Sequence, residues 1–256
     1  LGVFDFVRSH SSLRIHISTQ ANTTNKFAAD YWRRAGAERV VLAREVPLRE
    51  IAEISDYCPD LQLEAFVHGA MCVSYSGRCL MSNYLAHRNA NRGECVQACR
   101  WQWEVREVGR DGFMPVDEDE RGTYLFNSKD INMLAHLPEL IDAGVVSFKL
   151  EGRMKSSFYV ATVTNAYRRA LDAIARGEFH SELIAELEAE LSKASHREYT
   201  TGFYLDEQAS RQYYPSSKAL ETYKFIAVVK SVSSDGAVTI EQRNKFAIGD
   251  VLETLS

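Results

Sequence analysis

The sequence has no long hydrophobic run, no visible signal peptide and no excess of positive charge. No apolar stretch approaches the roughly 20 residues that a membrane-spanning helix needs, so we expect no membrane partner. No signal peptide is visible at Leu1, and because no Met begins the chain we expect a fragment or a processed piece. Its 30 Lys and Arg against 35 Asp and Glu exclude a basic field over the whole surface, although local basic patches are compatible with this balance.

Cysteine is scarce, and its count is odd. Five cysteines in 256 residues argue against the disulfide framework of a secreted protein, so we expect a cytoplasmic, reducing location. Four of the five lie within the 28 residues from Cys72 to Cys99. Chance would spread them along the chain, and this clustering therefore predicts that they serve as ligands.

Several catalytic signatures are also missing. The chain contains no His-Glu-x-x-His motif of zinc peptidases and no Gly-x-Ser-x-Gly motif of serine hydrolases. It also lacks the Cys-x3-Cys-x2-Cys spacing that radical enzymes use. The sequence thus gives no motif for proteolysis and none for a standard radical mechanism.

Short apolar runs alternate with segments of helical spacing through the first two-thirds of the chain. The runs predict strands at Ile15–Ser18, Arg39–Ala43, Leu61–Val67 and Val145–Leu150, with a further short one at Tyr124–Asn127. This alternation is typical of parallel β/α units. A closed barrel of such units has eight strands in about 250 residues. We therefore predict an incomplete TIM-type β/α barrel, its C-terminal half, with an open doubly wound sheet as the alternative.

The end of the chain has a different pattern. Two apolar runs, Phe225–Val232 and Ala237–Gln242, flank Ser-Ser-Asp-Gly, which predicts a hairpin, and Phe246–Leu252 predicts one more strand. We infer a small β-barrel-like domain that stops early. The predicted division is a partial barrel domain over residues 1–195 with a cysteine-rich loop at 72–107, a linker at 196–222, and the start of a C-terminal β-domain at 223–256.

Polar side chains follow the ends of the predicted parallel strands. In parallel α/β folds, catalytic groups gather at the carboxyl ends of the strands. Each of these residues alone fits a solvated loop charge or a local cap equally well, but together they predict a pocket for a small anionic or polar molecule. They are Thr19, Gln20, Arg44, Glu45, His68, Asn127, Lys129, Lys149, Glu151, Arg153 and Lys155.

The cysteine loop is the most specific feature. Six residues separate Cys72 from Cys79, fifteen lead to Cys95, and three more lie before Cys99. Four thiolates on one loop can enclose an iron–sulfur cluster. Zinc is the alternative, although its ligand pairs lie about two to four residues apart, and unliganded core thiols are a third interpretation. Cys58 lies on an apolar helix face and predicts a buried small side chain.

Aromatic residues and arginines surround the cysteines. Aromatic rings with arginine suit stacking on unpaired bases and contacts to phosphate, and a hydrophobic shell that keeps water off a cluster is the alternative. We favour the shell for the tryptophans, whereas the arginines are harder to explain in that way. The residues are Tyr75, Trp101 and Trp103, with Arg88, Arg92, Arg100 and Arg106.

Several stretches of the chain resemble the peptidase U32 family. The most specific is residues 64–82, Glu-Ala-Phe-Val-His-Gly-Ala-Met-Cys-Val-Ser-Tyr-Ser-Gly-Arg-Cys-Leu-Met-Ser, and the resemblance covers nearly the whole chain. Within that family the sequence is most similar to the tRNA hydroxylation proteins, while a sister branch hydroxylates a cytidine in ribosomal RNA. The other stretches are residues 15–22, 39–45, 93–101, 122–130 and 148–156.

The resemblance implies a function that the residues alone do not. It implies formation of 5-hydroxyuridine at the tRNA wobble position, with prephenate as the hydroxyl source and tRNA as the partner. It also places Cys72, Cys79, Cys95 and Cys99 at the positions of the family's iron–sulfur ligands, which implies a 4Fe–4S cluster. Family members begin with further β/α units, so we expect either a fragment or a second chain that completes the barrel.

These observations lead to one main assignment and two alternatives. We expect a pocket that binds the carboxylates of a small donor, or the uridine, with His68 and Glu64 as candidates for proton transfer. The alternatives are a collagenase-like, metal-dependent peptidase of the same family and an RNA- or partner-binding module with a structural metal loop. The expected pocket residues are Arg44, His68, Lys149, Glu151 and Arg153.

Overall fold

A computed structural model describes most of the chain. The described residues are 1–72, 74–75, 77–101, 104–105, 114–115, 129–153, 155–205 and 223–255, with the backbone alone at 100, 104–105 and 114–115. The α-helices are α1 (Gly2–His10), α2 (Lys26–Ala35), α3 (Leu48–Tyr57), α4 (Met81–Ala86), α5 (Leu137–Asp142), α6 (Ser157–Arg176) and α7 (Ser181–Lys193). Short 3-10 turns are η1 (Thr19–Ala21), η2 (Ala90–Arg92), η3 (Ala98–Arg100) and η4 (Leu134–His136).

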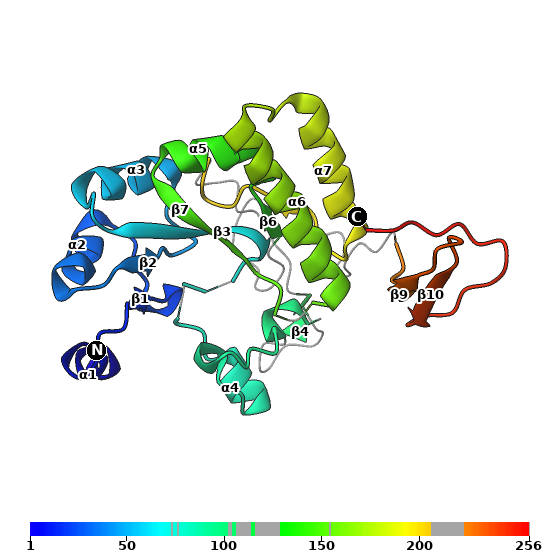
Figure 1. The fold of residues 1–256 in the computed structure, drawn as a ribbon. Coiled ribbons are helices and arrows are strands. Elements are labelled where there is room, and N and C mark those ends of the chain that lie inside the picture. The colour runs from blue at the N-terminus through cyan, green and yellow to red at the C-terminus, as the bar shows by residue number, and fades with distance from the viewer. Residues whose placement is uncertain are drawn as a thin grey trace.

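The strands form one mixed sheet and two small antiparallel pairs (Figure 1). In the mixed sheet, β1, β2, β3 and β7 are parallel neighbours, β6 is antiparallel to β3, and β8 is parallel to β6. The fold is thus a mixed α/β fold with a sheet rich in parallel strands, as the sequence predicts. The strands are β1 (His16–Ile17), β2 (Arg39–Val41), β3 (Gln62–Ala70), β4 (Glu104–Val105), β5 (Met114–Pro115), β6 (Asp130–Asn132), β7 (Val145–Leu150), β8 (Tyr199–Thr200), β9 (Ala227–Val232) and β10 (Val238–Gln242).

Strand β3 is the centre of the sheet. It pairs with β2 at its start, with β7 from Leu63 to His68, and with β6 from His68 to Ala70. His68 is in register with residues of both β6 and β7, so β3 changes partner at this residue. The cysteine segment, residues 72–101, begins two residues after the end of this strand.

Local sequence explains where the helices begin and end. The Asn25 side chain accepts a hydrogen bond from the Ala28 amide at the start of α2, and Gly36, with φ of 98°, ends that helix. The Ser156 hydroxyl accepts from the Tyr159 amide at the start of α6, which Gly177 ends. Each cap satisfies a backbone group that the helix itself leaves without a partner.

Helices α3, α5 and α6 lie along one side of the sheet, whereas α4 lies apart from it (Figure 1). The core between sheet and helices contains fully buried side chains such as Val40, Ile51, Leu63 and Leu140. Burial of each such side chain contributes about 1.5–3 kcal/mol. Cys58 is also fully buried, as its place on the apolar face predicts.

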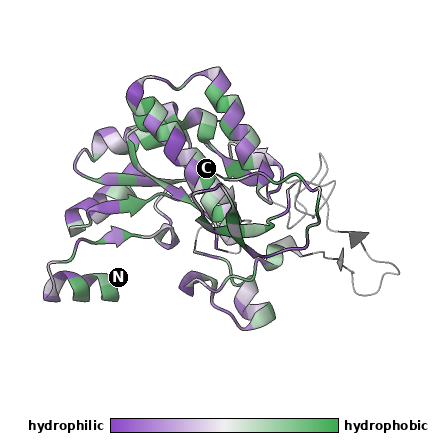
Figure 2. Cartoon of the chain, turned by 45° about the vertical axis from the view of Figure 1, so that its right-hand side comes forward, coloured by the Kyte–Doolittle hydropathy of each residue, from purple (hydrophilic) through white to green (hydrophobic). Residues whose placement is uncertain are grey.

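Some predicted elements differ from the structure. Phe246–Leu252 is not a strand: Ile248 and Val251 are fully exposed there, and no described strand pairs with this stretch. Helix α1 was not predicted; it buries none of its residues, although Figure 2 shows hydrophobic residues along it. The strand predicted at Tyr124–Asn127 lies outside the described residues.

The predicted linker and C-terminal domain are described only in part. Within 196–222, β8 joins the sheet and Tyr204 is buried, donating its hydroxyl hydrogen to the Phe66 carbonyl at 2.7 Å. Strands β9 and β10 form the predicted antiparallel hairpin. The ring of Phe225 stacks on that of Phe158 of α6. The domain boundaries and the incomplete barrel stay predictions.

No helix in the described part of the chain is both long enough and apolar enough to cross a membrane.

Candidate functional site

Arg44, which follows β2, lies in a buried cradle against Phe66 of β3. The guanidinium carbon is 3.6 Å from the centre of the Phe66 ring, and the arginine side chain is only 8% exposed. Glu151 Oε2 lies 3.7 Å from Nη2, and the buried Nε atom has no hydrogen-bond partner in the described structure. A buried guanidinium with an unused donor is suited to receive an oxyanion.

Lys149 of β7 lies on the same aromatic ring. Its Nζ atom is 5.5 Å from the ring centre of Phe66 and 3.1 Å from Glu64 Oε1. Arg44 and Lys149 therefore converge on one aromatic platform from two parallel strands. Phe66 was not among the predicted residues, although it lies two positions from both Glu64 and His68 on β3.

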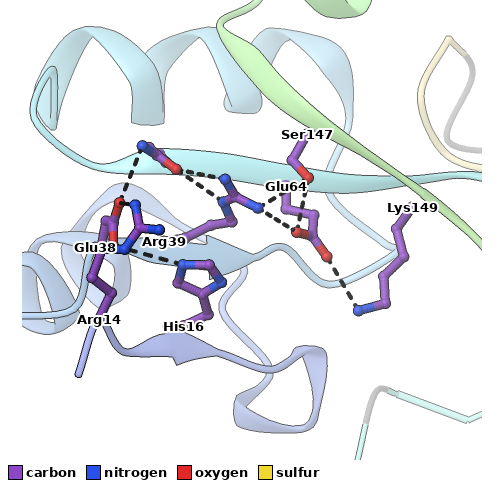
Figure 3. A network of polar contacts seen from close by, with 8 residues as sticks. Arg14, His16, Glu38, Arg39, Glu64, Ser147 and Lys149 are labelled. Atoms are coloured by element: carbon purple, nitrogen blue, oxygen red, sulfur yellow. Dashed lines mark hydrogen bonds and ion pairs between the residues drawn. The ribbon is translucent and has the colours of Figure 1, made fainter.

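Glu64 acts as a counter-ion at this site. It accepts hydrogen bonds from Ser147 at 2.9 Å, from Lys149 at 3.1 Å and from Arg39 at 3.3 Å (Figure 3). Burial alone would raise the pKa of Glu64, but these three hydrogen bonds outweigh it and hold the pKa below its usual value. A carboxylate held in its charged form is poorly suited to donate a proton, so its contacts favour a role in orienting Lys149.

The network around Glu64 extends across the parallel strands (Figure 3). Arg39 of β2 donates to Gln62 at 2.7 Å and 3.0 Å as well as to Glu64. Farther along, Glu38 lies 3.2 Å from Arg14 and 3.8 Å from His16 of β1. Arg39 is directly opposite Gln62 in the parallel register, so pairing of neighbouring strands was the signal that could have revealed this network.

Glu151 and Arg153 connect this site to the cysteine segment. The Arg153 amide donates to Glu151 Oε1 at 3.0 Å. A Cβ added at Gly93 would lie 3.7 Å from Arg153 Nη1, so the guanidinium faces the segment between Cys79 and Cys95. The structure thus brings Arg44, Lys149 and Glu151 together, with Arg153 at the boundary with the cysteines.

His68 lies in a different environment from the other predicted pocket residues. It is 1% exposed and contacts the rings of Tyr159, Tyr167 and Tyr199. Simple alternation along β3 would place it beside Phe66, but the pairing with β7 shifts register between Phe66 and His68. Such an irregularity re-aims the side chains beyond it, which accounts for the separation.

Hydrogen bonds around Tyr167 determine the His68 tautomer. Two acceptors lie within reach of the one hydrogen of the Tyr167 hydroxyl, the Val67 carbonyl oxygen at 2.8 Å and Asn132 Oδ1 at 3.2 Å. The hydroxyl oxygen accepts from the Met133 amide at 3.2 Å. His68 Nδ1, 3.3 Å from that oxygen, must therefore be the donor. This leaves a lone pair on Nε2, which is buried and has no hydrogen-bond partner in the described structure.

His68 is neutral at physiological pH. Burial lowers the pKa of His68 from about 6.5 to about 3; the charges of His196 and Lys155 act in the same direction and that of Asp130 opposes them. An imidazole with so low a pKa is a hydrogen-bond acceptor rather than a proton donor at neutral pH. Its geometry therefore favours a binding or structural role.

The chain of hydrogen bonds that starts at His68 reaches helix α7. Asn132 Nδ2 donates to Glu188 Oε2 at 2.6 Å, and burial raises the pKa of Glu188 although this hydrogen bond opposes the rise. His68, Tyr167, Asn132 and Glu188 thus form one connected polar group. The last three were not predicted, because they come from elements with no sequence motif.

The cysteine segment, residues 72–101, is attached to the sheet by a close backbone approach. A Cβ added at Gly77 would lie 2.5 Å from the Gln20 carbonyl oxygen, and Gly77 has φ of +78°. A side chain at this position would collide with η1 and also favour a different backbone conformation. Glycine here therefore allows the segment to lie against the end of β1.

The sulfur of Cys95 has two hydrogen-bond donors. The buried Ser82 hydroxyl donates to Cys95 Sγ at 3.6 Å, and the Gln97 amide donates to the same sulfur at 3.3 Å. Ser82 also accepts from the Val96 amide at 3.1 Å, which fixes the hydroxyl. Hydrogen bonds to sulfur stabilise a thiolate and tune a metal that it ligates.

Cys72 lies within electrostatic reach of two other cysteines. Although the residue as a whole is exposed, loss of water around the sulfur raises the pKa of the Cys72 thiol; Arg44 opposes this rise, and Cys95 and Cys79 add to it. Among the described residues, no group of three or more His, Cys, Asp and Glu side chains is arranged to hold a metal ion. Four thiols on one segment still fit a thiophilic metal or cluster, and the assignment of Cys72, Cys79, Cys95 and Cys99 as ligands stays a prediction.

The aromatic residues beside the cysteines are largely exposed. Tyr75 is 67% exposed and Trp101 is 46% exposed. A hydrophobic shell of tryptophans around a cluster stays a prediction. Trp103, Arg106 and Asn127 lie outside the described residues, and so does the side chain of Arg100.

Comparison with known proteins identifies the family. The model of peptidase family U32 matches residues 1–213, and that of the U32 C-terminal domain matches residues 221–256. The chain belongs to peptidase family U32. No solved structure gives a significant match to this family member.

The relatives of this U32 protein include proteins named for RNA hydroxylation and proteins named for proteolysis. It is 34% identical to tRNA hydroxylation protein P of Escherichia coli over 100% of the chain and 65% of that protein. It is 36% identical to tRNA hydroxylation protein P1 of Bacillus subtilis over 94% of the chain and 58% of that protein. It is also 32% identical to a protein of Porphyromonas gingivalis named collagenase, over 77% of the chain and 49% of that protein. The chain therefore spans less than two-thirds of the length of these relatives.

Proposed function

We propose that this U32 protein acts in RNA hydroxylation, converting the wobble uridine of tRNA to 5-hydroxyuridine. The observation that carries the proposal is the similarity to tRNA hydroxylation proteins along the whole chain. The cationic cradle beside the cysteine segment supports it, because a hydroxylation that uses a small anionic donor needs such a site next to its redox centre.

The roles of the residues follow from their contacts. Arg44 and Lys149 would bind the carboxylates of prephenate, which the family resemblance implies as co-substrate, with Phe66 beneath them and Glu64 orienting Lys149. Glu151 and Arg153 would link this donor site to the cysteine segment. His68 would hold the end of β3 in place and offer Nε2 as an acceptor.

Cys72, Cys79, Cys95 and Cys99 would hold an iron–sulfur cluster of the 4Fe–4S type, with zinc as the alternative metal. When bound, such a cluster supplies redox chemistry. The protein would provide the thiolates, donate hydrogen bonds to Cys95 from Ser82 and Gln97, and hold the segment beside Arg44.

We further propose that the four parallel strands belong to a TIM-type β/α barrel and that the protein works in the cytoplasm. The order β1, β2, β3, β7 with helices on one side supports the barrel. The opposite face carries the charged network of Figure 3, which suits the inside of a barrel around a polar site. A further part of the protein, or a second chain, would complete it.

The decisive experiment combines cluster and nucleoside analysis. Anaerobically purified protein is expected to contain iron and acid-labile sulfide, and Cys79→Ala to lose both. In a strain without its own tRNA uridine hydroxylation, the wild-type protein should restore 5-hydroxyuridine by nucleoside mass spectrometry, and Cys79→Ala should not. Cys58→Ala is the matched control, because Cys58 is buried away from the segment. Full hydroxylation by Cys79→Ala would refute the cluster role.

A second candidate is a metal-dependent peptidase, which the relative named collagenase favours. It predicts gelatin cleavage by the purified protein that a metal chelator abolishes. A third, an RNA-binding module with a structural metal loop, predicts salt-dependent RNA affinity without turnover. Zinc in place of iron would favour these two over hydroxylation.

A further inference from the structure

The cysteine segment has a charge opposite to that of the whole protein. Residues 72–101 contain four arginines and one acidic residue, Glu94, in a chain with a net charge of −5. The Glu94 carboxylate accepts a hydrogen bond from the Asn89 amide at 3.1 Å, so it serves the fold of the segment. Arg78, Arg88 and Arg92 are exposed. The segment is therefore a local basic patch on an acidic protein.

The same segment exposes large apolar and aromatic side chains. Tyr84 of α4 is 84% exposed, Leu80 is 74%, Tyr75 is 67% and Trp101 is 46%. Exposure of several such side chains on one short segment marks an interaction surface, whereas single exposed ones need no explanation. We call these four residues, with Arg78, Arg88 and Arg92, the aromatic–arginine surface.

Internal hydrogen bonds keep this surface in one piece. Ser82 of α4 bonds to Cys95 and Val96, and helix α4 contacts η3, which Trp101 follows. The Asn91 side chain donates to the Gly77 carbonyl at 3.2 Å. Helix α4 projects away from the sheet in both views of the chain (Figures 1 and 2). The rings are thus presented on a connected structure beside the cysteines.

We propose that the aromatic–arginine surface is the RNA-docking surface, on which Tyr84 and Trp101 stack on unpaired bases and Arg78, Arg88 and Arg92 contact phosphates. The proposal rests on the proposed function and specifies its RNA subsite. Aromatic rings stack on any base, and interleaved arginines follow the backbone, which is how single-stranded RNA is bound. A membrane surface fits less well, because α4 has only six residues and is too short for an amphipathic helix lying on lipid.

The test measures binding of a labelled RNA hairpin of anticodon stem–loop size by fluorescence anisotropy, with a fully paired duplex of equal length beside it. The full chain should bind the hairpin more tightly than the duplex. Tyr84→Ala should weaken hairpin binding about tenfold, as loss of one base-stacking ring does, and Tyr84→Phe should restore it. Tyr31→Ala is the matched control, because Tyr31 is 49% exposed on α2, and it should bind as wild type.

The arginines are tested by salt dependence. Arg88→Gln should reduce the slope of log affinity against log salt by about 0.7–1, the loss of one phosphate contact. The control Arg168→Gln, on α6 and paired with Asp172, should leave the slope unchanged.

The outcomes separate this proposal from the proposed function. Tight hairpin binding that is equal in wild type, Tyr84→Ala and Arg88→Gln would overturn the docking surface and leave hydroxylation standing. If the wild-type protein bound no RNA, that result would overturn both the docking surface and the proposed RNA hydroxylation. Binding to anionic lipid vesicles or to an acidic protein that the same variants lose, with RNA binding unchanged, would overturn the RNA assignment.

Discussion

The parallel sheet and the cysteine segment hold their side chains in different ways. In the sheet, Leu63 is fully buried, and Glu64 beside it has three hydrogen-bond donors. In the segment, Leu80 and Tyr84 are mostly exposed, and a few contacts such as those of Gly77 and Ser82 keep it in place. The difference indicates that the sheet holds its charged side chains in fixed positions at the proposed donor site, whereas the segment exposes large side chains to solvent.

The largest change in stability should come from replacing a leucine in the sheet, and the matched replacement in the cysteine segment should have little effect. Leu63→Ala is expected to lower the free energy of unfolding by about 2–5 kcal/mol, because it leaves a cavity in the core. Leu80→Ala should change it by less than about 0.5 kcal/mol, since Leu80 is 74% exposed. Urea unfolding of both variants measures the pair. If both variants lost the same free energy of unfolding, the segment would be part of the core and the two regions would not differ in this way.

The attachment of the segment is tested by two glycines. Gly77→Ala should destabilise by about 2–3 kcal/mol, because the added Cβ meets Gln20 at 2.5 Å and φ is positive. Gly177→Ala has a similar φ of +71° but open space around the Cβ, so it should cost only about 1 kcal/mol. Limited proteolysis should cut within residues 72–101 faster in Gly77→Ala alone. Similar behaviour of both variants would mean that the contact with Gln20 does not hold the segment.

The buried imidazole of the sheet should make stability depend on pH. The folded pKa of His68 is about 3 and the unfolded value about 6.5, so the unfolded state binds the extra proton as pH falls between these values. Stability should therefore be full above about pH 6.5 and fall by about 2 kcal/mol between pH 7 and pH 5. Glu188, with its raised pKa, acts in the opposite direction, so the comparison is made with His68→Gln. An equally steep decline in His68→Gln would assign the effect to other groups.

The smallest change in stability should come from removing the Ser82 hydroxyl, which donates to the Cys95 sulfur. Ser82→Ala removes one hydrogen bond to Cys95 and one acceptor of the Val96 amide, which should cost about 1 kcal/mol of stability. If the proposed cluster is present, its reduction potential should also fall, because hydrogen bonds to ligand sulfur favour the reduced state. Ser82→Thr should keep both properties near wild type. An unchanged potential in Ser82→Ala would mean that this hydroxyl does not act on the cluster.

Much of the scaffold could be predicted from sequence. The strand at Val145–Leu150 has the predicted bounds, because the local apolar run decides where it begins and ends. Helix α1 was not predicted; none of its residues is fully buried, and Phe4 is the residue of this helix that packs against the core. The strand predicted at Phe246–Leu252 is wrong because an apolar run becomes a strand only where another strand pairs with it.

The candidate site was predicted in part. Strand-end reasoning brought Arg44, Lys149 and Glu151 together, because parallel strands place their carboxyl ends at one edge. It assigned His68 to the same group, and the register shift in β3 places that residue among tyrosines instead. A sequence shows alternation but not a shift of register, so this separation could only come from the structure.

The pairing of β3 has a consequence for the order in which the protein opens. Its backbone is bonded by β2, β6 and β7, and the hydroxyl groups of Tyr167 and Tyr204 bond its Val67 and Phe66 carbonyls. No single neighbour can leave and expose the strand, so its amide hydrogens should exchange with solvent only through global unfolding. Exchange of the amides at 65–67 should thus be among the slowest in the protein. The cysteine segment would then begin next to a strand that stays folded until the whole protein unfolds.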